Sequence, residues 1–197
     1  MTAVLRNRRA FLRGLGTALC AAALAACTTP RPIEGAAPGA FSRVGRFAIT
    51  VNEEGGKQSA VQGGFSWLDD GSRYVLDLTN PLGSTEARVE GGPGAATLTK
   101  ADGTRLSADN PDALAAEALG SSMPVSGLRD WLRGRLPASP QASGVTRDDI
   151  GHLAAFEQGG WHARLSRYDA QGPCLLVLER QEPGRRILVR LVVNQPS

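Results

Sequence analysis

Short runs in which apolar and polar residues alternate dominate the chain after residue 40. In the clearest run, Thr85–Glu90, the apolar Ala87 and Val89 alternate with charged side chains. Successive side chains of a β-strand point to opposite faces, so this alternation predicts a half-exposed antiparallel strand. Similar runs predict further strands over residues 47–51, 74–79, 96–100, 151–158, 161–168, 173–180 and 186–194.

Pairs that contain glycine or proline separate these runs and predict turns. Hairpin turns are predicted at Asp102-Gly103, Gly159-Gly160 and Pro183-Gly184. Asp69-Asp70-Gly71 predicts another turn, where the two carboxylates are expected to be solvated rather than catalytic. Gly63-Gly64, just before Phe65 and Trp67, predicts a bulge or a tight bend, because glycine marks such points within strands.

The middle of the chain switches to the helical spacing of apolar residues. Asn110 and Pro111 are typical of a helix start, as a side-chain cap and a first-turn proline, and Gly120 is a natural end. A second short helix is predicted from Ser126 to Gly134. Both helices are too short to be stable alone, so we expect them to pack on the sheet. Their apolar stripes are Leu114, Ala115, Ala118 and Leu119 in the first helix, and Leu128, Trp131 and Leu132 in the second.

Residues 1–26 have the features of a cleavable export signal. Four arginines precede a run from Leu15 to Ala26 in which nearly every residue is Leu, Ala, Gly or Cys, and which is far shorter than the roughly 20 residues of a membrane-spanning helix. The run ends in Leu24-Ala25-Ala26-Cys27, which resembles the bacterial lipobox. The sequence therefore predicts cleavage before Cys27, a diacylglycerol and an N-acyl chain such as palmitate on Cys27, and a tether over residues 27–40 that is rich in Pro, Ala and Gly.

Neighbouring residues bear on the export route and the destination. The adjacent arginines within Asn7–Arg13 resemble a twin-arginine signal, but Asn7 stands where Ser or Thr is usual, so an ordinary Sec signal fits equally well. Thr28 follows Cys27 at the position where an aspartate would retain a lipoprotein in the inner membrane. The sequence thus predicts a lipid anchor in the periplasm-facing leaflet of the outer membrane.

The net charge of the mature chain gives no support to nucleic acid as a partner. Four of the 22 basic residues and none of the 19 acidic residues lie in 1–26, which leaves 18 basic and 19 acidic residues and a net charge of −1. The sequence pI of about 9.0 therefore belongs mainly to the signal. We expect residues 41–197 to form one domain, because about 155 residues suffice for a core of their own.

Candidate chemistry is sparse, so neither an enzyme nor a metal is expected. His152 and His162 lack metal-ligand spacing, and Cys174 is the one cysteine that remains in the domain. Cys174 lies in an apolar run and is expected to be a small buried hydrophobe. The stretch Gly91-Gly92-Pro93-Gly94 precedes no predicted helix, so it predicts a turn rather than a phosphate cradle. The covalent acyl groups on Cys27 are the only non-protein groups expected.

Five segments of the domain carry residues that are more specific than a strand or helix pattern requires. They are Gly45-Arg46-Phe47-Ala48, Gly64-Phe65-Ser66-Trp67, Thr79-Asn80-Pro81-Leu82-Gly83-Ser84-Thr85-Glu86, Met123-Pro124-Val125 with Leu128–Gly134, and Gly160-Trp161 with Tyr168. In this order, and behind a lipobox, they resemble the LolB family. The stretch before the first strand is shorter than in some of its members, which leaves open whether an N-terminal helix is present, and Val192-Val193-Asn194 stands where the family often has a tryptophan.

The resemblance implies a fold and a function. The implied fold is an incomplete, strongly curved, mostly antiparallel β-barrel with an apolar cavity beneath a helical lid. The implied function is to accept lipoproteins from the periplasmic carrier LolA and to insert them into the outer membrane, with cargo, carrier and phospholipid as partners of a monomer. The implied acyl-binding residues, which ordinary core packing would explain as well, are Phe47, Trp67, Leu76, Leu78, Leu128, Trp131 and Trp161.

The resemblance also implies a membrane-insertion loop at Leu82, flanked by Pro81 and Gly83. In the family the matching leucine protrudes into solvent and is needed to deliver cargo to the membrane. The residues alone favour a leucine that tucks back into the core, so the two interpretations predict opposite exposures for Leu82.

Two other functions stay open at this point. The first is a lipid-binding lipoprotein of related fold that lacks transfer activity. The second is a scaffold lipoprotein whose sheet docks partners, which predicts a filled interior and no uptake of fatty acid. An envelope hydrolase is the least supported, because no nucleophile elbow or metal set occurs.

Overall fold

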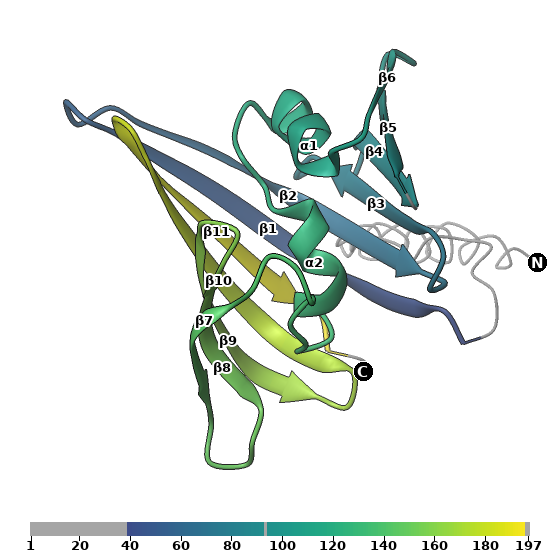
Figure 1. Cartoon of the computed structure of the whole chain (residues 1–197). Coiled ribbons are helices and arrows are strands. Elements are labelled where there is room, and N and C mark those ends of the chain that lie inside the picture. Colours follow the sequence, from purple (N-terminus) through teal and green to yellow (C-terminus); the bar gives the residue numbers. More distant parts are fainter. Residues whose placement is uncertain (1–38, 93, 196–197) are drawn as a thin grey trace, which may run out of the picture.

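The computed structural model describes residues 39–92 and 94–195, which form one antiparallel sheet and two short helices (Figure 1). The sheet has 11 strands in the order β6-β5-β4-β3-β2-β1-β11-β10-β9-β8-β7. Strands adjacent in sequence pair with one another on each side, and the pairing of β1 with β11 joins the two halves. The strands are β1 (Phe41–Glu53), β2 (Gln58–Asp69), β3 (Tyr74–Thr79), β4 (Thr85–Gly92), β5 (Ala95–Lys100), β6 (Arg105–Ala108), β7 (Ser143–Arg147), β8 (Leu153–Gln158), β9 (Trp161–Asp169), β10 (Gly172–Glu182) and β11 (Arg185–Val193).

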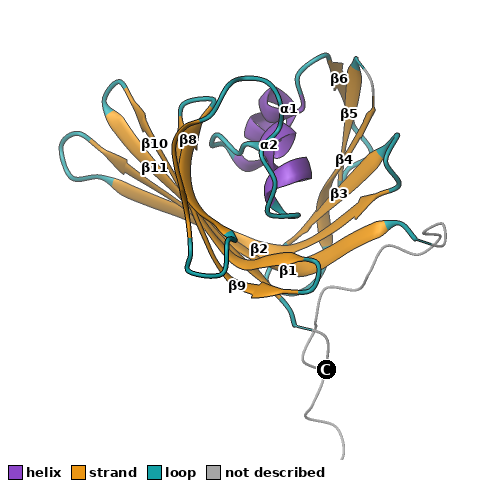
Figure 2. Cartoon of the chain, turned by 60° about the horizontal axis from the view of Figure 1, so that its bottom comes forward, coloured by secondary structure: helices purple, strands orange, loops and turns teal. Residues whose placement is uncertain are grey.

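The sheet curves around the two helices, α1 (Pro111–Leu119) and α2 (Val125–Trp131), which lie on its concave side (Figure 2). Strands β6 and β7 are its two edges, so the sheet does not close into a barrel. The predicted fold class, an incomplete and curved antiparallel barrel covered by helices, is therefore confirmed. Within the described part of the chain, no helix combines the length and apolarity needed to cross a membrane.

Alternating side chains build the core between the sheet and the helices. In β1, Phe47, Ile49 and Val51 are buried, and in β4 Ala87 and Val89 are buried while their charged neighbours are exposed. These positions match the predicted apolar faces. Each such side chain contributes roughly 1.5–3 kcal/mol when fully buried, so the covered face of the sheet is the main stabilising surface.

Helix α1 begins and ends where its capping residues predict, whereas α2 ends at Trp131, before the predicted end at Gly134. The side chain of Asn110 accepts a hydrogen bond from the backbone N–H of Asp112 at 2.9 Å, and Gly120 ends α1 in the left-handed conformation at φ 67°. Helix α2 begins at Val125, one residue before the predicted start. The reason is Pro124, whose carbonyl already accepts a helical hydrogen bond from the N–H of Leu128 at 3.1 Å.

The two edge strands, β6 and β7, were not predicted from the sequence. Strand β6 has four residues, of which Leu106 is the single large apolar one, and every residue of β7 is exposed. An edge strand that is short or open to solvent needs no apolar face, so it leaves no alternating pattern to read. The prediction of a loop over 137–144 is therefore wrong for Ser143 and Gly144, which belong to β7.

The predicted bulge at Gly63-Gly64 is wrong, because β1 and β2 pair there without interruption. The register shift of this region lies between Leu78 and Thr79, in the pairing of β3 with β4. Glycine is needed at 63 because the strands approach closely: an added Cβ would lie 1.9 Å from the Thr79 carbonyl oxygen and 3.1 Å from the Phe47 ring. The glycine signal therefore reflects a steric contact rather than an extra residue.

Candidate functional site

The seven residues predicted to bind acyl chains lie together in one apolar cluster between the concave face and α2. Each of them is at most 4% exposed. Five come from the strands and two from α2, so the cluster joins the sheet to its helical cover. The members are Phe47, Trp67, Leu76, Leu78 and Trp161 on the sheet, and Leu128 and Trp131 on the helix.

Ring contacts hold this cluster in a closed arrangement. Trp67 stacks on Tyr74 with ring centroids 4.9 Å apart, and Trp131 of α2 meets Phe156 of β8 at 5.3 Å with the rings tilted by 59°. An added Cβ at Gly127 would lie 2.7 Å from the Trp131 ring, so the helix closes tightly over its own tryptophan. Aromatic pairs of this geometry contribute about 0.5–1.5 kcal/mol beyond the area that they bury.

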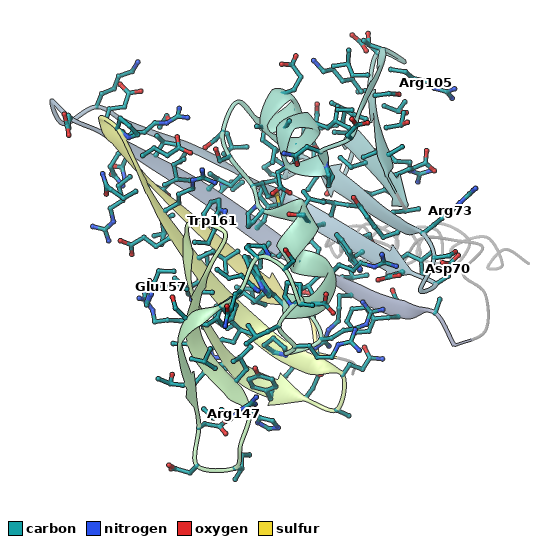
Figure 3. The ribbon with its side chains drawn as sticks, in the orientation of Figure 1. Asp70, Arg73, Arg105, Arg147, Glu157 and Trp161 are labelled. Carbon is teal, nitrogen blue, oxygen red and sulfur yellow. The ribbon has the colours of Figure 1, made fainter. Side chains whose placement is uncertain are left out.

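A small hollow borders α2 beside this cluster. Its volume is about 80 Å³, and its lining includes Trp131, Trp161, Gln158 and Pro140. Pockets that enclose a drug-sized ligand measure roughly 300–1,000 Å³, so this hollow is too small for a whole acyl chain. Figure 3 labels Trp161 on β9, at the border of this region. We call this arrangement, in which most of the predicted acyl-binding residues pack against one another and only Trp131 and Trp161 border the hollow, the closed form.

A carboxylate at the end of β2 holds one edge of the helical cover, α2, against the sheet. Arg129 donates from Nε to Asp69 Oδ2 at 2.9 Å and from Nη2 to Oδ1 at 3.1 Å. Arg133 donates from Nη1 to Asp69 Oδ2 at 2.8 Å. Arg129 also donates to the carbonyl oxygen of Gly71 in the following turn. We call Asp69, Arg129 and Arg133 the rim ion-pair cluster, because it ties α2 and the turn after it to the sheet.

Aromatic rings flank the two arginines of the rim cluster. The Arg133 guanidinium lies 4.0 Å from the centroid of the Phe41 ring, and that of Arg129 lies 5.9 Å from the Tyr74 ring. A guanidinium within about 6 Å of an aromatic face is attracted by the ring quadrupole. The rim cluster is thus supported by the first residue of β1 and by the first residue of β3.

The prediction that both carboxylates of the β2–β3 turn are solvated is wrong for Asp69, which is 2% exposed. Its neighbour Asp70 is exposed and accepts hydrogen bonds from the turn, as expected (Figure 3). Burial alone would raise the pKa of Asp69, but hydrogen bonds from Arg129 and Arg133 outweigh it and hold the pKa below its usual value. Asp69 is therefore ionised at neutral pH, with its charge fully engaged.

The opposite side of α2 is held by a neutral, buried hydrogen bond. Trp131 donates from Nε1 to Gln158 Oε1 at 2.9 Å, and the Gln158 amide donates to the carbonyl oxygens of Pro137 and Pro140 at 3.0 and 2.6 Å. A buried polar group that loses its partner costs about 1–3 kcal/mol, so this contact resists lifting of the helix.

Asp112 joins the two helices. It accepts from the backbone N–H of Ser126 at 2.7 Å and from its hydroxyl at 2.8 Å. Burial raises the pKa of Asp112, although the two hydrogen bonds from Ser126 oppose the rise. The helices are therefore connected to each other by one carboxylate, and we expect them to move together when the cover lifts.

The Leu82 side chain is 81% exposed at the tip of the β3–β4 loop. The Asn80 side chain accepts from the N–H groups of Leu82 and Ser84 at 3.0 and 3.1 Å, and the Asn80 carbonyl accepts from Gly83 at 2.9 Å. Gly83 has a φ of 89°, which glycine adopts without strain. Pro81 fixes the first turn position. The exposed position implied by the family is thus the observed one, and the alternative of a leucine tucked into the core is wrong.

Two residues of this surface were missed at the level of sequence. Asp69 was interpreted as a turn residue, although Arg129 and Arg133, four residues apart in the predicted helix, could have suggested a shared acidic partner. Ile150 was not singled out, yet it is 79% exposed. Its signal is an Asx residue two positions before it and a glycine after it, the pattern that also surrounds Leu82.

Residues 39–92 and 94–195 hold no group of three or more His, Cys, Asp and Glu side chains that could bind a metal. Cys174 is a free, buried thiol, as predicted, and burial raises its pKa. Cys27, the signal over 1–26 and the tether as far as residue 38 lie outside the described residues. Lipidation of Cys27 therefore stays a prediction from the sequence.

A family match and several relatives of this chain carry the same name. The family described as "Outer membrane lipoprotein LolB" matches residues 39–195. A protein of Bordetella pertussis named outer-membrane lipoprotein LolB is 69% identical over 179 residues, which cover 90% of each chain. One of Bordetella parapertussis with the same name is 66% identical, with 94% of each chain covered.

More distant proteins are similar over the same length. A protein of Cupriavidus pinatubonensis, also named outer-membrane lipoprotein LolB, is 38% identical over 202 residues, with 96% of this chain and 95% of that protein covered. Among solved structures, a LolA superfamily protein from Nitrosomonas europaea is similar at a TM-score of 0.41 and 9% identity, with 82% of this chain and 90% of that chain covered.

Proposed function

We propose, since this chain belongs to the LolB family of outer-membrane lipoproteins, that it receives lipoproteins from a LolA-type periplasmic carrier and passes them to the outer membrane. The observation that carries the proposal is the apolar cluster between the concave sheet and α2, closed by a rim of hydrogen bonds. No nucleotide, metal or catalytic residue is needed, because the protein moves an intact molecule between two apolar environments.

The physical task is to keep hydrocarbon away from water during a hand-over. Exposing an acyl chain to water costs about 0.8 kcal/mol per CH₂, so a free lipoprotein would aggregate or adhere elsewhere. A receptor must cover the chains while binding them less tightly than the bilayer does. A surface formed by a sheet and a small, detachable helical cover meets both demands, because the cover can close over cargo and lift at the membrane.

In this proposal α2 moves away from the sheet when cargo binds, since the hollow beside it, at about 80 Å³, is too small for an acyl chain. Lifting the helix exposes Leu128 and Trp131 together with the aromatic residues of the sheet. The apolar cost of opening is offset when hydrocarbon takes the place of the helix side chains. The free-energy difference between the open and closed forms then depends on the polar contacts at the edges of α2. These contacts are the rim ion-pair cluster and the Trp131–Gln158 hydrogen bond.

The exposed Leu82 supports a role at the bilayer. Residues 80–84 carry no ionisable side chain, so the loop can approach lipid without burying a charge. One leucine that enters lipid contributes only about 1.5–3 kcal/mol, which is too little to anchor a domain. It is enough to favour one orientation of a domain that is already held at the membrane.

In this proposal the anchor is the acylated Cys27, which holds the domain by several acyl chains. Gly39, where the described chain begins, is 12 positions after Cys27, and an extended chain of that length spans at most about 43 Å. β1 leads away from Gly39, and Arg46 of β1 pairs with Gly64 of β2, which in turn pairs with Thr79 at the end of β3. Arg46 therefore lies level with the start of the Leu82 loop, and it is five positions, or roughly 17 Å of strand, away from Phe41. The tether is long enough to let the Leu82 loop reach the membrane over this distance.

The decisive experiment is transfer in vitro. The full lipidated protein is reconstituted into liposomes and incubated with a LolA-type carrier that is loaded with a radiolabelled lipoprotein. We expect label to leave the carrier, to associate with the liposomes and to become resistant to extraction with alkaline carbonate. Release from the carrier without carbonate-resistant insertion would instead support the alternative, a lipid-binding lipoprotein without transfer activity.

A further inference from the structure

Ile150 and Leu82 are the two most exposed large apolar side chains of residues 39–92 and 94–195, at 79% and 81%. Ile150 belongs to the loop between β7 and β8, and this loop lies at the bottom of the view in Figure 1. Figure 3 labels Arg147 at the start of this loop. An isolated exposed isoleucine is common on protein surfaces, so the argument depends on how the loop holds it.

The Ile150 loop has the same hydrogen-bonding pattern as the Leu82 loop. The Asp148 side chain accepts from the N–H groups of Ile150 and His152 at 3.1 and 2.8 Å, as Asn80 does from Leu82 and Ser84. The backbone N–H of Gly151 donates to the Asp148 carbonyl at 3.0 Å, and that of Asp148 donates to the His152 carbonyl at 2.9 Å.

The glycines of the two loops also match. Gly151 has a φ of 90° and Gly83 a φ of 89°. Each loop thus fixes an apolar side chain at the third of five positions and points it away from the sheet. The His152 ring stacks on Tyr168 with centroids 4.2 Å apart, which attaches the Ile150 loop to β9. A fixed apolar tip loses little conformational entropy on binding, so it is suited to contact with a partner.

The two tips lie at opposite ends of the sheet. β3 and β8 run in the same direction, because an even number of antiparallel pairings separates them in the strand order. Leu82 follows the end of β3, whereas Ile150 precedes the start of β8. When the Leu82 end faces a bilayer, the Ile150 end faces away from it, where a soluble protein can approach.

Charge distinguishes the two tips further. The Ile150 loop contains Asp148 and Asp149, both exposed, whereas residues 80–84 contain no ionisable side chain. Entry of Ile150 into lipid would bring the adjacent Asp149 toward the hydrocarbon. The cost of placing an ionised aspartate there is at least as large as the gain from one isoleucine. An acidic apolar tip therefore fits a protein surface better than a membrane.

We propose that the Ile150 loop is a docking point for the cargo-bearing carrier, through a surface that presents a small apolar pocket rimmed by Lys or Arg side chains. Ile150 fills the pocket, and Asp148 and Asp149 face the basic rim. This inference rests on the proposed function and adds to it that one end of the sheet contacts the carrier and the other contacts the bilayer.

The test uses full lipidated protein in liposomes and a LolA-type carrier loaded with radiolabelled lipoprotein. The variants are Ile150→Ser and Asp149→Lys, and the matched control is Val61→Ser, which alters a partly exposed apolar residue of β2. We expect Ile150→Ser to raise the carrier concentration for half-maximal transfer about tenfold, as loss of an interface anchor does, and to leave the maximal rate of insertion unchanged. Asp149→Lys should raise the half-saturating concentration severalfold and remove much of its dependence on salt.

The outcomes separate this inference from the proposed function. If the wild-type protein takes no cargo from the carrier, the proposed function fails and the docking point fails with it. If the wild type transfers cargo and Ile150→Ser does so at the same half-saturating concentration, only the docking point is overturned. The docking point would also be overturned if Ile150→Ser slowed only the insertion step, or if it weakened only the binding of the protein to liposomes in the absence of carrier. In either case the loop would contact lipid.

Discussion

Asp69 and Arg129 are 60 residues apart in the sequence, and the carboxylate of the first accepts two hydrogen bonds from the guanidinium of the second. With Arg133 they form the rim ion-pair cluster that fastens α2 across the concave face. Asp69 is almost fully buried, while Arg129 keeps 31% of its side chain exposed. The contact is therefore strong when made, but water can reach one partner when it breaks, which suits a cover that has to open.

The first prediction concerns this contact. Asp69→Asn should lower the free energy of unfolding by about 2–4 kcal/mol, at the low end for a buried ion pair because Arg129 can be rehydrated. It should also raise the rate at which the domain takes up a fluorescent fatty acid, since the closed form loses its charged fastening. Urea denaturation and stopped-flow fluorescence measure the two effects.

Asp130→Asn is the control, because Asp130 pairs with the exposed Arg135 of the same segment, and it should change stability by less than about 1 kcal/mol. Equal uptake by both variants would show that the rim does not govern opening.

The second prediction concerns acid. Hydrogen bonds from Arg129 and Arg133 outweigh burial at Asp69, and the hydrogen bond from Arg43 is the main cause at Asp169, so that both carboxyls have a pKa below their usual value. A carboxyl with a lowered folded pKa stabilises the protein above its unfolded pKa of about 3.9, and this contribution is lost as the pH falls through the folded value. We expect the two groups to add the same stability at pH 8 as at pH 5, and to lose it below about pH 4. The urea midpoint measured from pH 2 to pH 8 checks this, and the double variant Asp69→Asn, Asp169→Asn should show a flatter acid limb.

The third prediction concerns delivery. Leu82→Glu should still accept labelled lipoprotein from the carrier but should fail to insert it, because an ionised side chain at the tip opposes entry into lipid. Stability should stay within about 0.5 kcal/mol of the wild type, since Leu82 is 81% exposed. Leu82→Met keeps an apolar tip and should insert cargo normally. Insertion by Leu82→Glu at the wild-type rate would mean that Leu82 has been assigned the wrong role.

The fourth prediction tests the close approach of strands at Gly63. Gly63→Ala should destabilise the domain by roughly 2–4 kcal/mol, because the new Cβ would lie 1.9 Å from a backbone oxygen that cannot move without disturbing β3. Gly92→Ala is the matched control, since the nearest atom to its Cβ would be a flexible Arg73 carbon at 3.6 Å. Thermal unfolding of the two variants should therefore differ clearly, and similar midpoints would contradict the steric explanation.

Local sequence determined most of the secondary structure of this protein. The alternation in Thr85–Glu90 predicted a strand with one charged face, and Asn110 with Gly120 predicted the ends of α1, because both signals act within a few residues. The residues around Leu82 alone favoured a buried side chain, which is wrong; its exposure was implied by the family resemblance, and in the structure Asn80 and Gly83 build the loop that holds it in solvent. The export signal and the lipidation of Cys27 are predictions of the same local kind, from adjacent residues.

Only the tertiary structure decided which of these residues meet. Nothing near Asp69 in the sequence shows that it is buried, because its burial depends on two arginines supplied by another element. Whether the apolar residues of the sheet line a hollow or fill it depends equally on how α2 packs over them. The edge strands β6 and β7 follow the same rule: they are ordered by backbone pairing with a neighbour, an interaction that every sequence can make and that therefore leaves no pattern in the side chains.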